Sequence, residues 1–205
     1  MTLRSRQRHS SPDQGADERS APTAPKARRS RLRRRVTLVA LLLFVTFVAA
    51  TARLFVWPSL PPLPEHADAI IELGGPGDRD AVTTALAEDH RAPLVIQSTL
   101  ARDVTSPETC LPPIPHVTIE CFHADPATTR GEARYIGERG TASGWSSVII
   151  VTTPDHAWRA RMRVERCFPG QVYVATSPLP KVDWLRQIPY QWAATLKAEL
   201  FQRDC

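Results

Sequence analysis

An apolar segment without charged side chains, residues 36–52, constrains what this chain can fold into. The apolar character resumes after Arg53 and continues to Trp57. One helix over residues 36–57 would span about 33 Å at ~1.5 Å per residue, enough to cross the hydrocarbon core of a bilayer. The sequence therefore predicts a single transmembrane helix, with Arg53 snorkelling outward and Trp57 at the interface.

The charge distribution predicts the orientation of this helix. Residues 1–35 hold 11 of the 26 basic residues and three of the 21 acidic ones, a net charge of +8. The other 170 residues carry 15 basic and 18 acidic side chains, a net of −3. We therefore expect a single-pass plasma-membrane protein with its N-terminus in the cytoplasm and its C-terminal domain outside. The balance argues against a nucleic-acid-binding domain.

Residues 1–35 are polar and rich in arginine, serine and proline, which predicts a disordered tail. A cleaved signal peptide is an alternative to the membrane anchor, because Ala50-Thr51-Ala52 fits a cleavage site. The long basic region before the apolar segment and the apolar residues after this site favour an uncleaved anchor. In either case the remainder of the chain is exported.

The region after the helix divides into a linker and one domain. Residues 58–67 contain four prolines in the first seven positions, which predicts a stiff spacer that holds the domain off the membrane. Residues 68–205 are long enough for a single domain. Apolar runs predict strands at 69–73, 93–97, 117–121, 147–152 and 171–175. Helical patterns lie at 78–88, 129–138, 155–167 and 189–201, and residues 98–116 are expected to form a loop. This alternation predicts a three-layer α/β domain with a mainly parallel sheet of about five strands.

Ligands of open α/β sheets bind beyond the carboxyl ends of the strands, so the residues that follow each strand are candidates. Gly74 and Gly75 follow the first strand, with Arg79 in the next helix. Such a turn presents backbone N–H groups to an anion. It matches neither the dinucleotide nor the NTP motif. The alternative is a plain tight turn, with Arg79 paired to Asp78 or Asp80.

Thr129 and Glu132 follow the third strand. The two residues fit a capping box, in which Thr129 and Glu132 would satisfy the first N–H groups of the helix. A carboxylate near the strand ends is also suited to act as an acid or base.

Thr153, His156 and Arg159 follow the fourth strand. Thr153 is expected to cap the helix and Pro154 to occupy its first position. The helix dipole disfavours the charged form of His156, and a neutral imidazole there can act as a base or bind a ligand. Arg159 can pair bidentately with a phosphate or carboxylate. The alternatives are a surface histidine and an arginine stripe that faces solvent.

The four cysteines all lie in the exported region, and their number is even, which predicts two disulfides. We favour Cys110–Cys121, which would close the proline-rich loop onto the third strand, and Cys167–Cys205, which would tie the last helix to the preceding one. The alternatives are the other pairings and buried free thiols.

No metal site and no particular cofactor are predicted. His116, Cys121 and His123 are close in sequence, but they lack a standard zinc spacing.

Three segments, taken together and in this order, resemble the DUF218 family of YdcF-, SanA- and ElyC-like envelope proteins. They are Asp68–Gly75 with Arg79, then Thr129 with Glu132, and then Val151–Ala160, which contains His156 and Arg159. The resemblance implies a Rossmann-like domain behind one membrane helix and a role in cell-envelope maintenance, in peptidoglycan or lipid-carrier metabolism. The sequence departs from the family pattern at Gln97-Ser98-Thr99, where the family has S-G-G, which implies an altered part of the pocket.

The expected function is binding, and potentially cleavage, of an anionic envelope metabolite, namely a glycan or lipid carrier that bears phosphate or diphosphate. Glu132 and His156 would be the catalytic acid–base pair. The ligand-binding residues would be Gly74, Gly75, Arg79, Thr129, Thr153 and Arg159. These side chains should meet in one cleft, provided that the first and fourth strands are neighbours. The alternative is a non-catalytic module that senses the ligand or scaffolds envelope enzymes.

Overall fold

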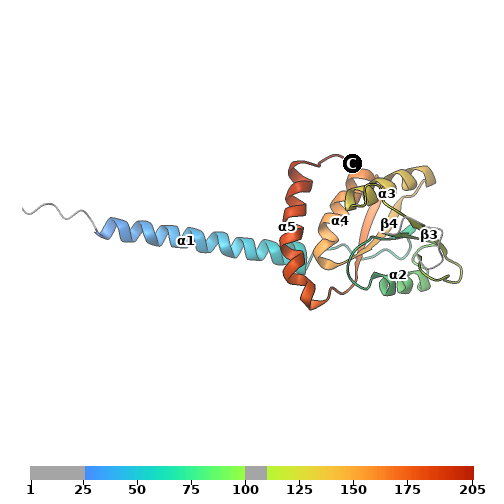
Figure 1. Ribbon diagram of the computed structural model, residues 1–205, viewed down its shortest axis with the longest axis horizontal. Helices are drawn as coiled ribbons and strands as arrows, with labels where there is room; N and C mark the ends of the chain where they lie inside the picture. The colour runs from blue at the N-terminus through green and yellow to red at the C-terminus, as the bar shows by residue number, and fades with distance from the viewer. Residues whose placement is uncertain (1–25, 100–109) are drawn as a thin grey trace, which may run out of the picture. The chain divides into compact units, whose positions relative to one another are not determined.

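The computed structural model describes residues 26–99 and 110–205 (Figure 1). The described residues belong to two units, one that ends at Leu43 and one that begins at Phe44. The predicted loop at 98–116 lies in part outside the described residues; its described part, 110–116, has no regular secondary structure.

Helix α1 (Lys26–Thr51) continues into a π-helical turn, η1 (Ala52–Val56). Residues 30–56, which run from α1 to the end of η1, form the one described helical segment that is long and apolar enough to cross a membrane. The prediction of a disordered tail is wrong over residues 26–35, which are helical. Arginine, lysine, alanine and leucine are strong helix formers, so a helix nucleated in the apolar segment extends into them at little cost. Residues 1–25 of that tail lie outside the described residues.

The domain is built on a five-stranded sheet in which all neighbouring strands are parallel, in the order β3-β2-β1-β4-β5. The strands are β1 (Ala69–Glu72), β2 (Leu94–Ser98), β3 (Thr118–Phe122), β4 (Ser147–Thr152) and β5 (Gln171–Thr176). This confirms the prediction of a Rossmann-like α/β fold. Strands β1 and β4 are neighbours, so the direction of strand order reverses between them, and that position is where such sheets bind ligands.

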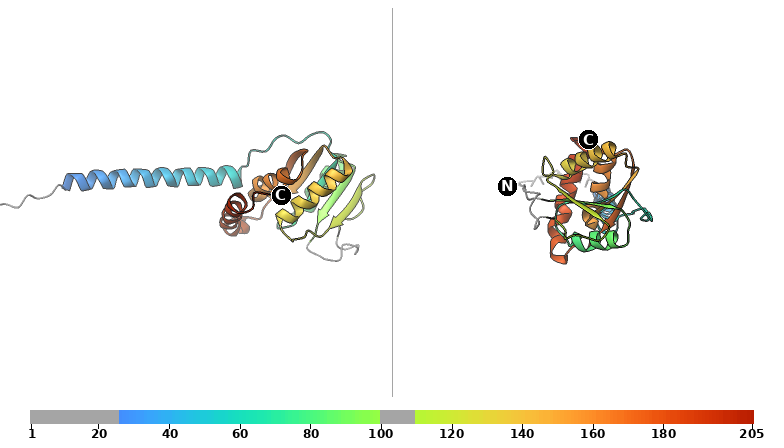
Figure 2. Two further views of the ribbon diagram at one scale, coloured as in Figure 1. Left: turned by 90° about the horizontal axis from the view of Figure 1, so that it is seen from above. Right: turned by 90° about the vertical axis from the view of Figure 1, so that its right-hand side faces the viewer.

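Helices cover both faces of the sheet (Figure 2). They are α2 (Arg79–Glu88), α3 (Thr129–Ser143) and α4 (Pro154–Cys167). Helix α5 (Trp184–Leu200) follows a short 3-10 turn, η2 (Lys181–Asp183), and packs against α4. Ile71 and Ile150 pack against α3 and α4, whereas Ile70 and Ile149 pack on the side of α2. Successive strand residues point to opposite faces of the sheet. Strands β1 and β4 are apolar except near their ends, so they are buried on both faces.

Helix α3 runs five residues beyond its predicted end because two glycines in it are packing positions. A Cβ at Gly137 would lie 2.4 Å from the Cys167 carbonyl oxygen, and one at Gly140 would lie 2.6 Å from the Phe168 ring. Both glycines let α3 approach the end of α4 closely. The helix ends at Gly144, whose φ of +68° suits glycine.

Helix α5 begins at Trp184 rather than at the predicted Pro189. The η2 turn already starts the helical path, and Pro189 lies on the exposed side of α5. The proline removes one backbone hydrogen bond but does not end the helix.

The linker, residues 58–67, packs on the domain, so the prediction of a free spacer is wrong. Leu60 packs against the core on the α3 and α4 side, and Leu63 packs against the core on the α2 side. Arg91 donates to the Pro64 carbonyl oxygen (2.8 Å), and its own carbonyl accepts from Ala67 N (2.8 Å). Burial of the apolar side chains of Leu60 and Leu63 stabilises the packed linker relative to an extended, solvated one.

Both predicted disulfides are present, Cys110–Cys121 and Cys167–Cys205, and they use all four cysteines. Two such bonds indicate a domain that matures in an oxidising compartment.

Candidate functional site

The turn after β1 is held in place by Arg79, which is only 4% exposed. Its Nη1 donates to the carbonyl oxygens of Leu73 and Gly74 (2.7 Å for Gly74), and its Nε donates to Pro76 O (3.2 Å). Gly75 has a φ of +135°, and a Cβ there would lie 2.8 Å from Arg79 Nη2. The guanidinium group therefore positions the backbone of this turn.

The alternative pairing of Arg79 with a neighbouring acid is wrong. Asp78 instead precedes α2, where its carboxylate accepts from Ala81 N (3.4 Å). Asp80 accepts from the Gln97 amide (3.3 Å).

Glu132 extends from the first turn of α3 to the turn after β1. Its Oε1 accepts a hydrogen bond from Gly74 N (2.7 Å), and the residue is 5% exposed. The capping-box interpretation is wrong, because Thr128 caps α3 by accepting from Gly131 N (3.3 Å). Burial raises the pKa of Glu132, whereas the Gly74 N–H group and nearby arginines oppose this shift.

His156 lies in the first turn of α4, with Thr153 at the cap position and Pro154 first in the helix, as predicted, although the Thr153 side chain makes no capping hydrogen bond. Its Nδ1 is 2.8 Å from Thr152 Oγ1, and its Nε2 is 3.1 Å from Thr129 Oγ1. The residue is 5% exposed, and burial, with a contribution from Arg159, holds the pKa of His156 well below its usual value. The imidazole is therefore neutral, with one ring nitrogen as donor and the other as acceptor.

Arg159 shares Thr129 with this histidine. Its Nη1 donates to Thr129 Oγ1 (3.1 Å), and its Nε donates to Gln191 Oε1 (2.9 Å) on α5. Gln191 in turn donates to the Asp155 carboxylate (2.8 Å). The alternative of a solvent-facing arginine stripe on α4 is wrong for Arg159 and Arg163, because α5 and the segment after it cover both.

Two cavities meet at the turn after β1. One, of about 370 Å³, is lined by Gly74, Gly75, Thr129, Glu132 and Arg159 among others. The other, of about 260 Å³, shares the two glycines and is lined also by Arg79, Thr153 and His156. The structure thus places all eight sequence-predicted residues at the β1/β4 switch point, but it divides them between two cavities that share Gly74 and Gly75, rather than in one cleft.

The larger cavity, called here the main cavity, is strongly cationic. Its lining residues include five cations and one carboxylate, Glu132. The cations are Arg130, Arg134, Arg159, Arg163 and Lys197. Sequence reasoning missed four of them, all but Arg159, because they come from three helices whose packing a single sequence does not reveal.

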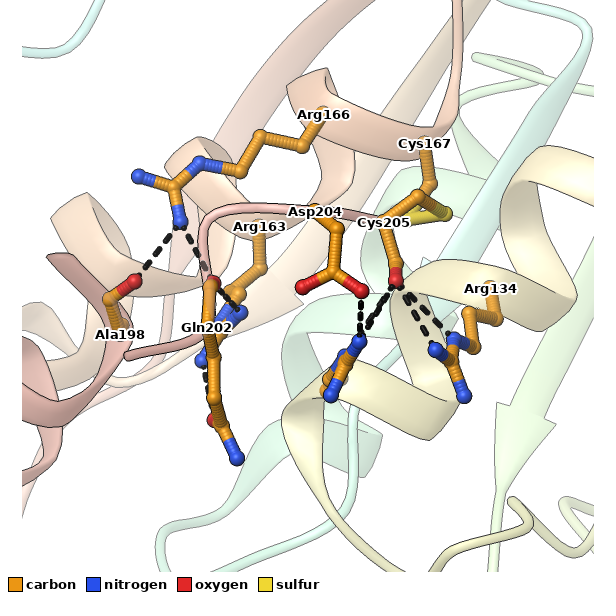
Figure 3. A network of polar contacts seen from close by, with 9 residues as sticks. Arg134, Arg163, Arg166, Cys167, Ala198, Gln202, Asp204 and Cys205 are labelled. Atoms are coloured by element: carbon orange, nitrogen blue, oxygen red, sulfur yellow. Dashed lines mark hydrogen bonds and ion pairs between the residues drawn. A yellow bond between two sulfur atoms is a disulfide. The ribbon is translucent and has the colours of Figure 1, made fainter. Parts of the chain in front are cut away.

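The last residues of the chain engage part of this charge (Figure 3). Asp204 pairs with Arg130, and the main-chain oxygen of Cys205 accepts from Arg134 (3.0 Å). Arg163 donates to the Gln202 carbonyl oxygen (2.6 Å). The Cys167–Cys205 disulfide fixes this segment beside the cavity.

Glu72 is a buried acid near the site that the sequence analysis did not single out. It is 4% exposed, and its Oε1 accepts from Gln97 Nε2 (2.9 Å). Burial, with a contribution from Asp80, raises the pKa of Glu72 to about 7. It lines a third cavity of about 260 Å³ with Gly74, Arg79 and Asp80. The sequence signal that could have indicated Glu72 is a single acidic residue in an otherwise apolar strand, just before Gly74 and Gly75.

Among residues 26–99 and 110–205, no group of three or more histidine, cysteine or acidic side chains is placed to hold a metal ion. Comparisons with protein-family models, curated proteins and solved structures find no match to this chain. The function is therefore inferred from the geometry of the cavities.

Proposed function

We propose that this chain is a single-pass membrane protein whose extracytoplasmic domain binds an anionic envelope metabolite in the main cavity. A glycan or lipid carrier that bears phosphate or diphosphate fits best, in keeping with the resemblance to DUF218 envelope proteins. The observation that carries the proposal is the set of five cations facing one carboxylate at the β1/β4 switch point.

The number of cations favours a phosphoryl group, which carries more negative charge, over a simple carboxylate. Arg159 offers a planar fork, which matches two oxygens of either group. The helices α3 and α4 both begin at the cleft, and their N-termini carry partial positive charge. Arg130, Arg134 and Arg163 lie further along the same cavity, so a second phosphate would meet charge as well.

Cleavage would use Glu132, which lines the main cavity, and His156, which lines the adjoining cavity that shares Gly74 and Gly75. A water molecule would attack phosphorus, the bond to the leaving oxygen would break, and the two protons of the water would end on that oxygen and on the released phosphate. Neutral His156 is able to accept a proton from the water, and Glu132, whose pKa is raised, is able to donate one to the leaving oxygen.

One observation favours the non-catalytic alternative. Both ring nitrogens of His156 already bond to threonine hydroxyls, and Glu132 is already bonded to Gly74. A ligand-sensing or scaffolding module would keep these groups as fixed supports for the binding surface.

The proposed topology places the N-terminus in the cytoplasm. The basic residues 31–35 precede the apolar segment, and the disulfides require an oxidising compartment. A periplasm-only reporter fused after residue 205 should be active. Strong activity of a cytoplasm-only reporter at that position would contradict the topology.

Calorimetric titration of the full chain in detergent with pyrophosphate tests the binding proposal. Arg159→Lys should weaken binding by about 10- to 100-fold, because lysine lacks the planar fork. Arg161→Lys is the matched control, since Arg161 lies on the same helix and pairs with Glu165 on the surface. Equal affinities of the two variants, or no binding of pyrophosphate by the unaltered chain, would overturn the proposal. Phosphate release from pyrophosphate would distinguish the enzyme from the binding module.

A further inference from the structure

Helix α5 carries an apolar stripe on its outward side. We call this the α5 stripe; its members are Leu185, Pro189, Ala193, Leu196 and Leu200. They lie three or four residues apart and so share one side of the helix. Leu185 is 89% exposed, Leu196 52% and Leu200 61%.

The buried side of α5 has the opposite character to that of an ordinary surface helix. Its three buried residues are Gln191, Thr195 and Ala198, so only the small Ala198 is apolar, and Gln191 bonds to Arg159 and Asp155 of α4. A helix of a water-soluble domain usually turns its apolar side inward. In α5 the apolar side faces outward, which calls for an apolar partner outside the domain.

The bilayer is such a partner, because α5 contacts the helical segment that is suited to cross it. Trp192 of α5 donates from Nε1 to Thr51 Oγ1 (3.1 Å). Its ring stacks on Phe47 and meets Phe55 edge-on, with ring centroids 5.3 Å apart in each pair. Phe47, Thr51 and Phe55 all belong to the helical segment that is long and apolar enough to cross a membrane. Contact with that segment places α5 at the level where the span leaves the bilayer.

The charges beside the stripe suit a lipid surface. Lys181, Arg186 and Lys197 are exposed on η2 and α5. The acids of these two elements are Asp183, which is half-buried, and Glu199, which is paired with Arg166 (3.0 Å). Cations that flank an apolar side are typical of helices that lie in the plane of an anionic membrane.

We propose that the α5 stripe lies in the headgroup region of the same bilayer that α1 spans, so that the domain rests against the membrane. The inference rests on the proposed membrane anchorage and not on the identity of the ligand. It has a consequence for the site, because Tyr190, Ala194 and Lys197 of α5 line the main cavity. The cavity then opens beside the headgroups, where a lipid-linked phosphate would be presented.

Photocrosslinking of the full chain tests this. The chain is reconstituted in vesicles of phosphatidylethanolamine and phosphatidylglycerol, with p-benzoylphenylalanine replacing one residue at a time. Leu185 and Leu196 should form lipid adducts about fivefold more often than the control, Glu88. Glu88 is exposed on α2, across the sheet from α4 and α5. Leu41, within the span, is the positive control for membrane insertion.

A second variant keeps the test independent of the probe positions. Leu185→Glu combined with Leu196→Glu should lower lipid adducts at Leu200 about fivefold, because charges at these sites oppose interfacial binding. Adducts at Leu41 without any at Leu185 and Leu196 would overturn the inference while leaving the anchor intact. Crosslinks from the stripe to a second copy of the chain would also overturn it. Loss of the Leu41 adducts would contradict the anchorage itself.

Discussion

Glu132 accepts a hydrogen bond from the backbone N–H of Gly74, 2.7 Å away, although the two residues are 58 positions apart in the chain. The contact joins the first turn of α3 to the turn after β1. It turns the carboxyl group toward the glycine backbone that forms the shared wall of the cavities. An anion bound there would share the site with a carboxyl group whose pKa is raised by burial.

Replacing this acid should strengthen the binding of an anion. Glu132→Gln keeps an oxygen that can accept from Gly74 N but removes the negative charge. The affinity for pyrophosphate, measured by calorimetry at pH 7, should rise several-fold because one repulsion is lost, while any cleavage should cease. Weaker binding by the variant would contradict an anionic ligand at this position.

Replacement of Gly75 should disrupt the turn. Gly75→Ala places a methyl group 2.8 Å from Arg79 Nη2 at a φ of +135°. We expect a loss of about 2–4 kcal/mol of unfolding free energy, measured by urea denaturation. Gly144→Ala is the matched control, because it has positive φ but nothing within 4 Å. It should cost only about 1 kcal/mol. Equal losses would show that Arg79 does not confine the turn.

Glu72 should make the stability depend on pH. Its pKa is raised from 4.5 to about 7 in the folded domain, so the folded state holds a proton that the unfolded state has lost between these values. The contribution of Glu72 to stability should therefore be greatest below pH 4.5 and fall as the pH rises to about 7, by on the order of 2–3 kcal/mol. Glu72→Gln should remove this decline, and Glu88→Gln, at an exposed position, should not. Parallel stability profiles for the three proteins, from denaturation at several pH values, would contradict the assignment.

The fold followed from the sequence because its strands are short apolar runs separated by clear turn and cap signals. The run Ser147–Thr152 predicted a strand, and β4 is an inner strand with a neighbour on each side. The boundaries that were wrong depend on tertiary contacts. Gly137 and Gly140 resemble helix breakers until the close approach of α4 is known, and Leu60 resembles part of a spacer until the core it covers is known.

The site was predictable where its residues follow strands, since a parallel sheet brings all such positions to one edge. Arg130, Arg134 and Arg163 could not be assigned in this way. Their positions on α3 and α4 are compatible with an ordinary solvated surface. They become lining residues only because α5 and the segment after it pack over both helices.

The two disulfides should contribute unequally to stability. Cys167–Cys205 closes 38 residues and Cys110–Cys121 closes 11. Loop-closure entropy predicts losses of about 4 and about 3 kcal/mol when each pair is replaced by serine. Only the loss of Cys167–Cys205 also frees residues 202–205, which Arg134 and Arg163 bind. Pyrophosphate affinity should therefore change for that variant alone. Equal effects of both replacements on affinity, measured by calorimetry, would contradict a specific role for this segment.

Thr129 should prove to be the residue that links the histidine to the arginine. Its hydroxyl lies 3.1 Å from both His156 Nε2 and Arg159 Nη1, so one oxygen sets the position of two functional groups. Thr129→Val keeps the shape of the side chain but leaves both partners without this contact. We expect a loss of about 1–3 kcal/mol in unfolding free energy and a weakening of pyrophosphate binding by about tenfold. Thr141→Val, on the exposed side of the same helix, should change stability by no more than about 0.5 kcal/mol and leave binding unaltered. If Thr129→Val lowers stability but leaves the affinity unchanged, the hydroxyl supports the fold alone and Arg159 must be positioned by Gln191.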